Sequence, residues 1–319
     1  MRLVSLIRPP RLSPGDPIRI VAPSGPVDPQ RFETGVGILA ERYEPIYDSE
    51  RVLARSGYLA GDDASRLEAL HEAIADEQCR AVFLARGGYG LMRLLLDGGY
   101  GLMRLLLDID RTLLVSHPKP IVGFSDATVL LALCAETGVA SIHGPVVSQL
   151  GDLPAADVES LFALLESVEP GQLDIGLTEL ISGHARGPLL GGNIEVLTRL
   201  VGTPFEPDFS DAILFLEEVN EPPYRLDRLL THLELAGVFD RIVGIVIGEL
   251  CGCDRTADGE VQSPTSGDVV AERLGRLEIP VALNGSFGHG KRNLALPYGT
   301  IVELDTGAGT LTALESPVS

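Results

Sequence analysis

Residues 120–134 read PIVGFSDATVLLALC, and this stretch decides the fold class that the sequence predicts. Its first part, residues 120–124, has the length and apolar composition of a buried strand. Ser125-Asp126 ends that strand, and an apolar helical segment follows at once and extends through Cys134. A strand that turns directly into a helix is typical of α/β proteins, in which helices cover a parallel sheet.

Similar units occur upstream. Residues 17–22 (PIRIVA) and 81–85 (AVFLA) are short apolar runs, and each ends in a turn that contains glycine. Helices are predicted at residues 28–41 and from Asp63 onwards, where apolar residues recur at helical spacing. This alternation predicts a flavodoxin-like parallel-sheet domain over residues 1–150.

The pattern changes after residue 150. Residues 151–178 combine one acidic helix with a stretch that contains Pro and Gly, and we interpret them as a linker. Residues 179–319 are predicted to form a C-terminal mixed α/β, strand-rich domain, because strand signals outnumber helix signals there. Its expected strands include 213–216, 242–247, 281–283 and 300–304, and its expected helices are 194–201 and 226–236.

Charge and hydropathy exclude several classes of partner. The 319 residues carry a formal net charge of −20, from 45 acidic and 25 basic side chains, which repels nucleic-acid phosphates and anionic lipid headgroups. No run of 18 apolar residues is present, so we expect no membrane span. Pro9-Pro10 interrupt the arginine-containing start before a signal-type apolar core develops, so the expected location is the cytoplasm.

The four cysteines do not form the pattern of a secreted disulfide framework. Cys251-Gly252-Cys253 could supply two ligands to a metal, but no second Cys/His pair follows at ligand spacing. We therefore interpret these thiols as buried structural residues and expect no metal.

A tandem duplication interrupts the first half of the chain. Residues 87–97 (copy one) read GGYGLMRLLLD, and residues 98–108 (copy two) repeat the same eleven letters. Two short copies do not make a solenoid. A continuous helix through both copies would contain Gly98-Gly99, at a cost of roughly 1 kcal/mol for each glycine, so we expect a break there.

Ser125 stands where the predicted strand turns sharply into a helix. Such a turn resembles a nucleophile elbow, with Gly123 and Ala127 small enough to let the chain approach itself. The backbone N–H groups of a helix that starts at Asp126 would also favour a developing oxyanion. A plain N-cap role for Ser125 is the alternative, and the second glycine of the usual G-x-S-x-G is absent.

A nucleophilic serine needs a base and an acid that orients the base. His289 lies in the glycine-rich stretch NGSFGHGKRN, which can present an imidazole from a loop, and His143 in SIHGP is the second candidate. Glu217 and Glu218 end an apolar strand, where a carboxylate is costly unless it is hydrogen-bonded. One of these two glutamates is expected to be a solvated strand end.

Taken together, these segments resemble the LD-carboxypeptidase family, serine peptidases of the murein-recycling type. The resemblance runs along nearly the whole chain, through LSPGDPIRIVAPSGP, ARGGYG, GFSDATVLL, HGP, GGNIEVLTRLVGTPFEPDFSDAILFLEEVNEPPYRLDRLLTHL and GSFGHGKRNLALPYG, in that order. It implies two domains and a Ser–His–Glu triad. In this sequence the triad falls on Ser125 as nucleophile, His289 as general base and acid, and Glu217 as the orienting carboxylate.

The resemblance also implies the rest of the site. The oxyanion hole would consist of the backbone N–H groups of Gly88 and Asp126. Because the overall charge is unfavourable for an anionic peptide, we choose Arg86 as the residue that attracts a substrate carboxylate. The implied reaction is hydrolysis of the L,D-peptide bond to the terminal D-Ala of a cytoplasmic murein tetrapeptide during cell-wall recycling. It proceeds through an acyl-enzyme, without metal or organic cofactor, in a homodimer.

The duplication departs from the family pattern, because a single GGYG loop is expected. We expect copy one to form the oxyanion loop, since Arg86 and its strand tether it, and copy two to extend or bulge. Two other functions stay open. One is an immunity-type hydrolase of a peptide–nucleotide antibiotic, which the absence of Trp disfavours. The other is a non-catalytic module that binds a small anion through GGYG and GFSD.

Overall fold

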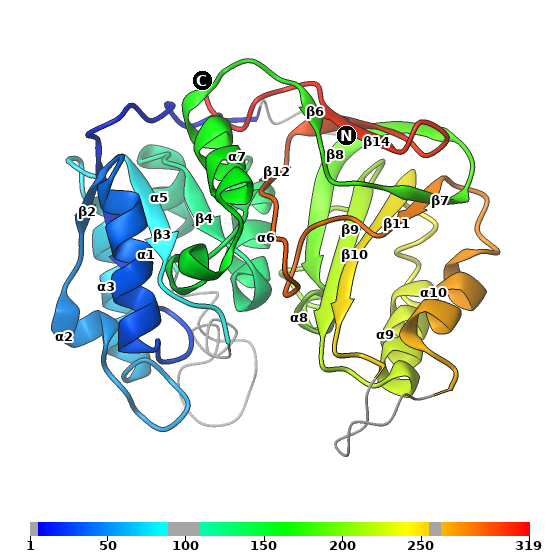
Figure 1. Cartoon of the computed structure of the whole chain (residues 1–319), viewed down its shortest axis with the longest axis horizontal. Helices are drawn as coiled ribbons and strands as arrows, with labels where there is room; N and C mark the ends of the chain where they lie inside the picture. The colour runs from blue at the N-terminus through cyan, green and yellow to red at the C-terminus, as the bar shows by residue number, and fades with distance from the viewer. Residues whose placement is uncertain (1–5, 89–108, 255–262) are drawn as a thin grey trace. The chain divides into compact units, whose positions relative to one another are not determined.

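The computed structural model describes residues 6–88, 109–254 and 263–319 (Figure 1). These residues form two compact units. The first extends to Val168 and also contains Ala295–Gly299 and Ser316–Ser319. The second consists of Glu169–Leu294 and Thr300–Glu315, so the chain returns to the first unit twice after it has entered the second.

The first unit is built on a six-stranded sheet with the order β12-β5-β4-β3-β1-β2. Strands β1 to β5 are parallel in the flavodoxin order, and β12 is added antiparallel at the β5 edge. The strands are β1 (Pro17–Val21), β2 (Glu44–Ile46), β3 (Ala81–Leu84), β4 (Ile121–Gly123), β5 (Ser141–His143) and β12 (Leu296–Tyr298).

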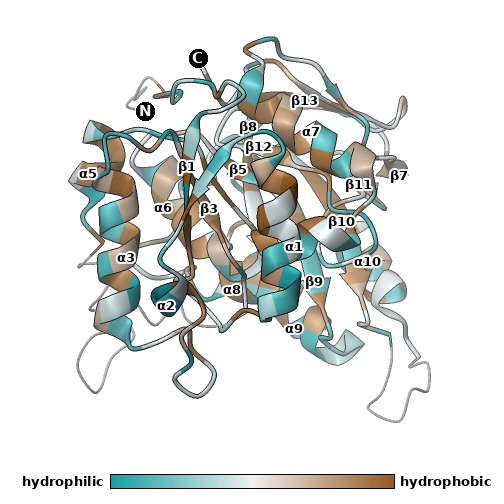
Figure 2. Cartoon of the chain, turned by 60° about the vertical axis from the view of Figure 1, so that its left-hand side comes forward, coloured by the Kyte–Doolittle hydropathy of each residue, from teal (hydrophilic) through white to brown (hydrophobic). Residues whose placement is uncertain are grey.

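Helices cover this sheet. The helices are α1 (Pro29–Ala40), α2 (Ser49–Val52), α3 (Asp63–Ala75), α5 (Arg111–Ser116), α6 (Thr128–Glu136) and α7 (Ala155–Glu166), with 3₁₀ turns η1 (Ser125–Ala127) and η2 (Val147–Asp152). In Figure 2, α1 and α3 carry polar and apolar residues on different sides. One core joins Phe32 of α1 and Phe162 of α7 to Ile20 and Phe83 of the sheet. The acidic helix that we expected in a linker therefore packs within the first unit.

The second unit is built on an eight-stranded mixed sheet with the order β6-β14-β13-β8-β9-β10-β11-β7. Its centre, β8 to β11, is parallel, and the outer strands pair antiparallel. The strands are β6 (Gln172–Leu173), β7 (Thr178–Ile181), β8 (His184–Asn193), β9 (Ile213–Val219), β10 (Gly244–Cys251), β11 (Val281–Leu283), β13 (Ile301–Asp305) and β14 (Thr310–Ala313). Its helices are α8 (Ile194–Thr198), α9 (Pro223–Leu235) and α10 (Ser266–Leu274).

The predicted fold class is confirmed: a mostly parallel N-terminal sheet is followed by a mixed, strand-rich C-terminal sheet. Several predicted boundaries were wrong. Strand β9 continues through Glu217 and Glu218 to Val219, because these residues pair with β8 and β10. Helix α8 ends at Thr198, and the chain then turns and reaches Gly202 at φ +79°, a conformation that favours glycine.

None of the helices within the described residues is both long enough and apolar enough to span a bilayer.

Candidate active site

Ser125 occupies a strained turn at the carboxyl end of β4. Its φ is +65°, which a non-glycine residue adopts rarely and at a cost. A Cβ at Gly123 would lie 2.8 Å from Cβ of Ala127 and 2.9 Å from Cδ1 of Leu84, so the turn needs both small residues. The α-helix starts at Thr128 and not at Asp126 as predicted, because residues 125–127 form a 3₁₀ turn first. This is the geometry of a nucleophile elbow.

The glycine turn after β3 lies against Ser125. A Cβ at Gly87 would approach Cβ of Ser125 to 2.9 Å and its Oγ to 3.2 Å. The carbonyl of Gly87 accepts a hydrogen bond from the N–H of Gly25, 3.3 Å away, and Nη1 of Arg86 donates to the carbonyl of Pro26. Gly88 has φ +104°, a region open to glycine.

The turns after β1, β3 and β4 therefore meet at one end of the first sheet. In flavodoxin-like sheets this end, next to the switch point between β1 and β3, is where ligands bind. Gly87 and Gly88 begin copy one of the duplication, and copy one is thus the copy attached to β3 beside Ser125. The expected break at Gly98-Gly99 lies outside the described residues.

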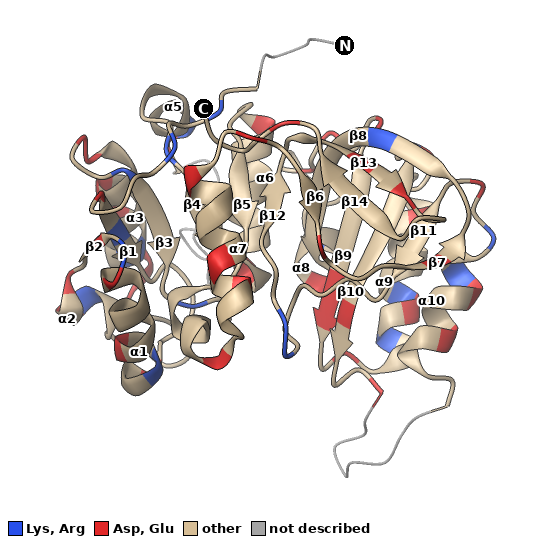
Figure 3. Ribbon diagram, turned by 45° about the horizontal axis from the view of Figure 1, so that its top comes forward, with Lys and Arg blue, Asp and Glu red and all other residues tan. Residues whose placement is uncertain are grey.

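The second unit pairs Glu217 with His289. The Nδ1 atom of His289 lies 2.6 Å from Oε2 of Glu217, and the Glu217 side chain is completely buried. The His289 side chain keeps 19% exposure, so the imidazole is held from one side and still reaches solvent. Figure 3 shows the acidic segments of β9 and β10 in red, within a sheet that is otherwise mostly uncharged.

The loop that carries His289 fits tightly against this carboxylate. Gly288 has φ +111°, and a Cβ there would lie 2.7 Å from Oε2 of Glu217. The N–H of Gly288 donates to Oδ1 of the buried Asn293, 2.9 Å away. Gly288 is therefore required by close packing, in addition to any flexibility it provides.

Glu218 points to other partners. Its Oε1 accepts hydrogen bonds from Nδ2 of Asn193 at 2.9 Å and from the N–H of Val219 at 2.8 Å. Its Oε2 accepts from the N–H of Glu195, also at 2.8 Å. The expectation that one of the two glutamates is a solvated strand end was wrong, because Glu217 and Glu218 are both buried.

The electrostatics of the pair suit a base that can hold a proton. Burial lowers the pKa of His289, but the charge of Glu217, the hydrogen bond that the imidazole donates to Glu217 and the charge of Glu218 outweigh it, and the pKa lies above its ordinary value. Burial raises the pKa of Glu218 to about 7, against the hydrogen bonds from Val219 and Asn193. A histidine oriented through Nδ1 by a buried carboxylate presents Nε2 for proton transfer.

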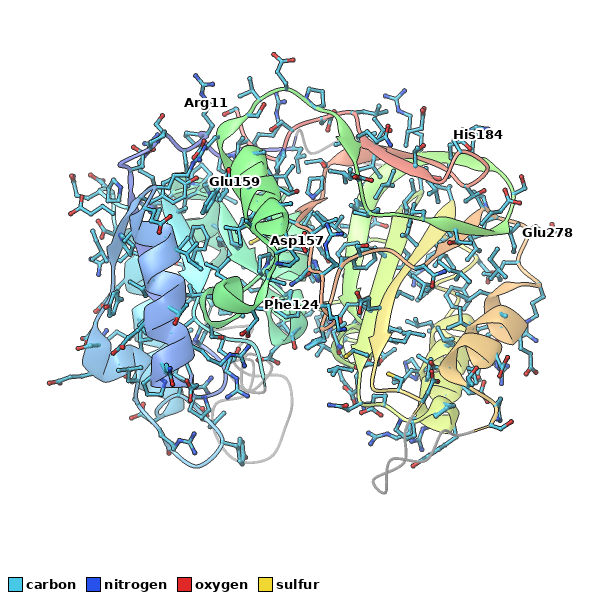
Figure 4. All side chains as sticks on the ribbon, viewed as in Figure 1. Arg11, Phe124, Asp157, Glu159, His184 and Glu278 are labelled. Atoms are coloured by element: carbon cyan, nitrogen blue, oxygen red, sulfur yellow. The ribbon has the colours of Figure 1, made fainter. Side chains whose placement is uncertain are left out.

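His143, the second histidine candidate, is buried in β5, and its ring packs edge-to-face on Phe124 with 6.0 Å between centroids. Phe124, labelled in Figure 4, immediately precedes Ser125. These contacts support a packing role for His143.

Cys251 and Cys253 are free thiols, Cys253 is buried, and burial raises its pKa to about 12.

The structure thus brings Glu217 and His289 together in the second unit, and Ser125, Asp126, Gly88 and Arg86 to neighbouring turns of the first. Sequence reasoning missed three supporting residues: Gly87 lies against Ser125, Asn293 accepts from the N–H of Gly288, and Asn193 donates to Glu218. Asn193 had a usable signal, since an Asn between a strand and a helix is a favoured N-cap, and its Oδ1 does accept from the N–H of Val196.

Comparisons with known proteins cover both units. Residues 18–97 and 94–144 match the family model of the LD-carboxypeptidase N-terminal domain, and residues 186–304 match that of the LD-carboxypeptidase C-terminal domain. The two N-terminal segments overlap at residues 94–97, within copy one of the duplication.

Relatives that match this chain over nearly its whole length are also carboxypeptidases by name. A putative carboxypeptidase of Synechocystis is 38% identical over 97% of this chain and 98% of its own. The murein tetrapeptide carboxypeptidase of Pseudomonas aeruginosa is 32% identical over 90% of this chain and 92% of its own. The microcin C7 self-immunity protein MccF, at 22% identity, has the same fold, with a TM-score of 0.83 over 98% of this chain and 100% of its own.

Proposed function

The chain belongs to the LD-carboxypeptidase family, and we propose that it hydrolyses the bond to the terminal D-Ala of a murein tetrapeptide by serine catalysis. The observation that carries the proposal is the buried Glu217–His289 pair, with 2.6 Å between Oε2 and Nδ1. The relative from Pseudomonas aeruginosa named for this activity supports the choice of substrate.

In the proposed reaction, Oγ of Ser125 attacks the carbonyl carbon of the scissile bond while Nε2 of His289 accepts the hydroxyl proton. Glu217 holds the imidazole in the tautomer with a proton on Nδ1 and stabilises the imidazolium that forms. His289 then gives its proton to the departing amine of D-Ala. A water molecule, activated by the same histidine, hydrolyses the ester on Ser125.

The oxyanion is assigned to the backbone N–H groups of Gly88 and Asp126. Support comes from the glycine turn, which lies within van der Waals distance of Ser125 through Gly87, and from the 3₁₀ turn in which Asp126 follows Ser125. A donor in such a position contributes on the order of 10²–10³ in kcat.

Arg86 is assigned to the attraction of a substrate carboxylate. It is exposed and adjoins the glycine turn, and a net charge of −20 makes a local cation necessary for an anionic peptide. We further assign the protein to the cytoplasm and propose that it forms a homodimer. Light scattering of the purified chain tests the oligomeric state.

The decisive experiment is incubation of the protein with murein tetrapeptide, followed by mass spectrometry for the loss of one alanine. The Ser125→Ala variant is the control, because it removes the nucleophile and leaves the fold intact. Hydrolysis by the parent and none by the variant is the expected result. Turnover by Ser125→Ala would exclude serine catalysis, and a parent that binds the peptide without turnover would favour a binding module.

A further inference from the structure

Glu249 lies on β10 beside the strand that carries Glu217. The pairing of β9 with β10 is irregular here: Ile247 pairs with Leu216 and Leu250 with Glu218, so Gly248 and Glu249 together face Glu217. Two residues opposite one form a β-bulge, and a bulge turns a side chain out of its regular alternation. The bulge thus gives the Glu249 side chain a direction that the regular alternation of a strand would not give it.

The backbone of Glu249 holds the start of the His289 loop. Its N–H donates to the carbonyl of Phe287 at 3.1 Å. The Phe287 ring packs against Gly248, where a Cβ would overlap it, and lies edge-to-face on Phe215 with 5.7 Å between centroids. The residue two positions before His289 is therefore fixed to the bulge.

The carboxylate of Glu249 holds the other side of the loop. It accepts a hydrogen bond from the backbone N–H of Arg292, and a Cβ at Gly290 would overlap its Oε2. Burial raises the pKa of Glu249, although this hydrogen bond and the charges of Arg292 and Lys291 oppose the shift. A half-buried carboxylate that is bound to the backbone of a loop restrains that loop.

The two carboxylates have different relations to His289. Glu217 lies against Gly288 and is bonded to the imidazole, whereas Glu249 lies against Gly290 and is bonded to the backbone beyond it. The charges of Glu217 and Glu218 raise the pKa of His289. The contacts of Glu249 are with the loop, so its influence on the imidazole passes through the position of the backbone.

We infer that Glu249 is a positioning residue that clamps the loop 287–292 to the bulge of β10 and so keeps His289 within hydrogen-bond distance of Glu217. The inference rests on the proposed function for its effect on catalysis. Without the clamp, the imidazole moves relative to Glu217. A displacement of about 1 Å in such a group reduces turnover on the order of 100-fold.

The test compares Glu249→Ala with Glu249→Gln and with Glu278→Ala, a matched control because Glu278 is exposed. The variants are compared at equal thermal stability. Glu249→Gln keeps a carbonyl oxygen that can accept from the N–H of Arg292. We expect Glu249→Ala to lower kcat by on the order of 10–100-fold with KM little changed, and Glu249→Gln and Glu278→Ala to stay near the parent.

A second measurement does not depend on turnover. The pKa of the His289 ring, followed by NMR, should fall in Glu249→Ala, because burial remains while the contribution of Glu217 weakens. It should stay at the parent's value in Glu249→Gln. If the parent has no peptidase activity, the proposed function fails, and this ring titration still decides the clamp.

Gly290→Ala provides an independent approach if Glu249→Ala does not fold. The added methyl group should displace the carboxylate and reproduce the fall in kcat and in the pKa of His289. The inference is overturned if Glu249→Ala or Gly290→Ala keeps both the kcat of the parent and the parent's pKa of His289. It is also overturned if Glu249→Gln loses as much as Glu249→Ala, since the effect would then come from charge.

Discussion

Gly288→Ala should damage the candidate site directly, because the added methyl group meets the carboxylate of Glu217. The new Cβ would lie 2.7 Å from Oε2 and 2.9 Å from Cβ of Glu217. It would also sit on a backbone with φ +111°, at a cost of about 1–3 kcal/mol. Overpacking adds about 1–3 kcal/mol, so the free energy of unfolding should fall by roughly 2–6 kcal/mol.

The catalytic effect follows from the same contact. Either the loop or the Glu217 side chain must move, and both movements lengthen the distance of 2.6 Å between Nδ1 and Oε2. We expect kcat to fall on the order of 100-fold while KM changes little. The assay is steady-state hydrolysis of the tetrapeptide together with urea unfolding followed by circular dichroism.

Gly267→Ala is the control, because Gly267 lies at the start of α10, where an added Cβ meets only an ordinary contact at 3.8 Å. This variant should be stabilised by about 0.4–1 kcal/mol and keep the parent's kcat. A Gly288→Ala protein with the stability and kcat of the parent would refute the reasoning, since the loop would then tolerate a side chain against Glu217.

Three further predictions concern the same machinery. Glu217→Gln should lower kcat by about 10⁴ and move the acidic limb of the pH–rate profile to lower pH, because the pKa of His289 falls while its burial remains; an unmoved limb would contradict this. Gly87→Ala should lower kcat on the order of 10–100-fold, because its methyl group would lie 2.9 Å from Cβ of Ser125, and mass spectrometric rates equal to the parent's would disprove it. Deletion of residues 98–108, which yields the same chain as deletion of copy one, should leave kcat unchanged, whereas a large gain would show that the insertion impairs catalysis.

Local sequence patterns predicted the first unit well. The strand–serine–helix stretch around Ser125 and the glycine turn after β3 follow from short-range chemistry, because both depend on residues within a few positions of each other. The start of α6 could not be predicted, since it depends on the positive φ of Ser125 and on the 3₁₀ turn that follows.

Contacts between distant segments were beyond sequence reasoning. Local patterns could not say which of Glu217 and Glu218 faces His289, because the register of β9 against β8 and β10 decides it, and the choice of Glu217 came from the family resemblance. Glu249 gave no signal either. Its role depends on a bulge, and a bulge is a property of two strands together.

The strand β12 has a consequence for synthesis of the chain on the ribosome. The sheet of the first unit receives β12 on β5 only when residues 296–298 have been made, after most of the second unit. Until then β5 is an open edge, which can pair with a strand of another chain. The nascent chain must therefore carry an unfinished first sheet while it builds the second, and a fragment that ends at Val168 is expected to aggregate.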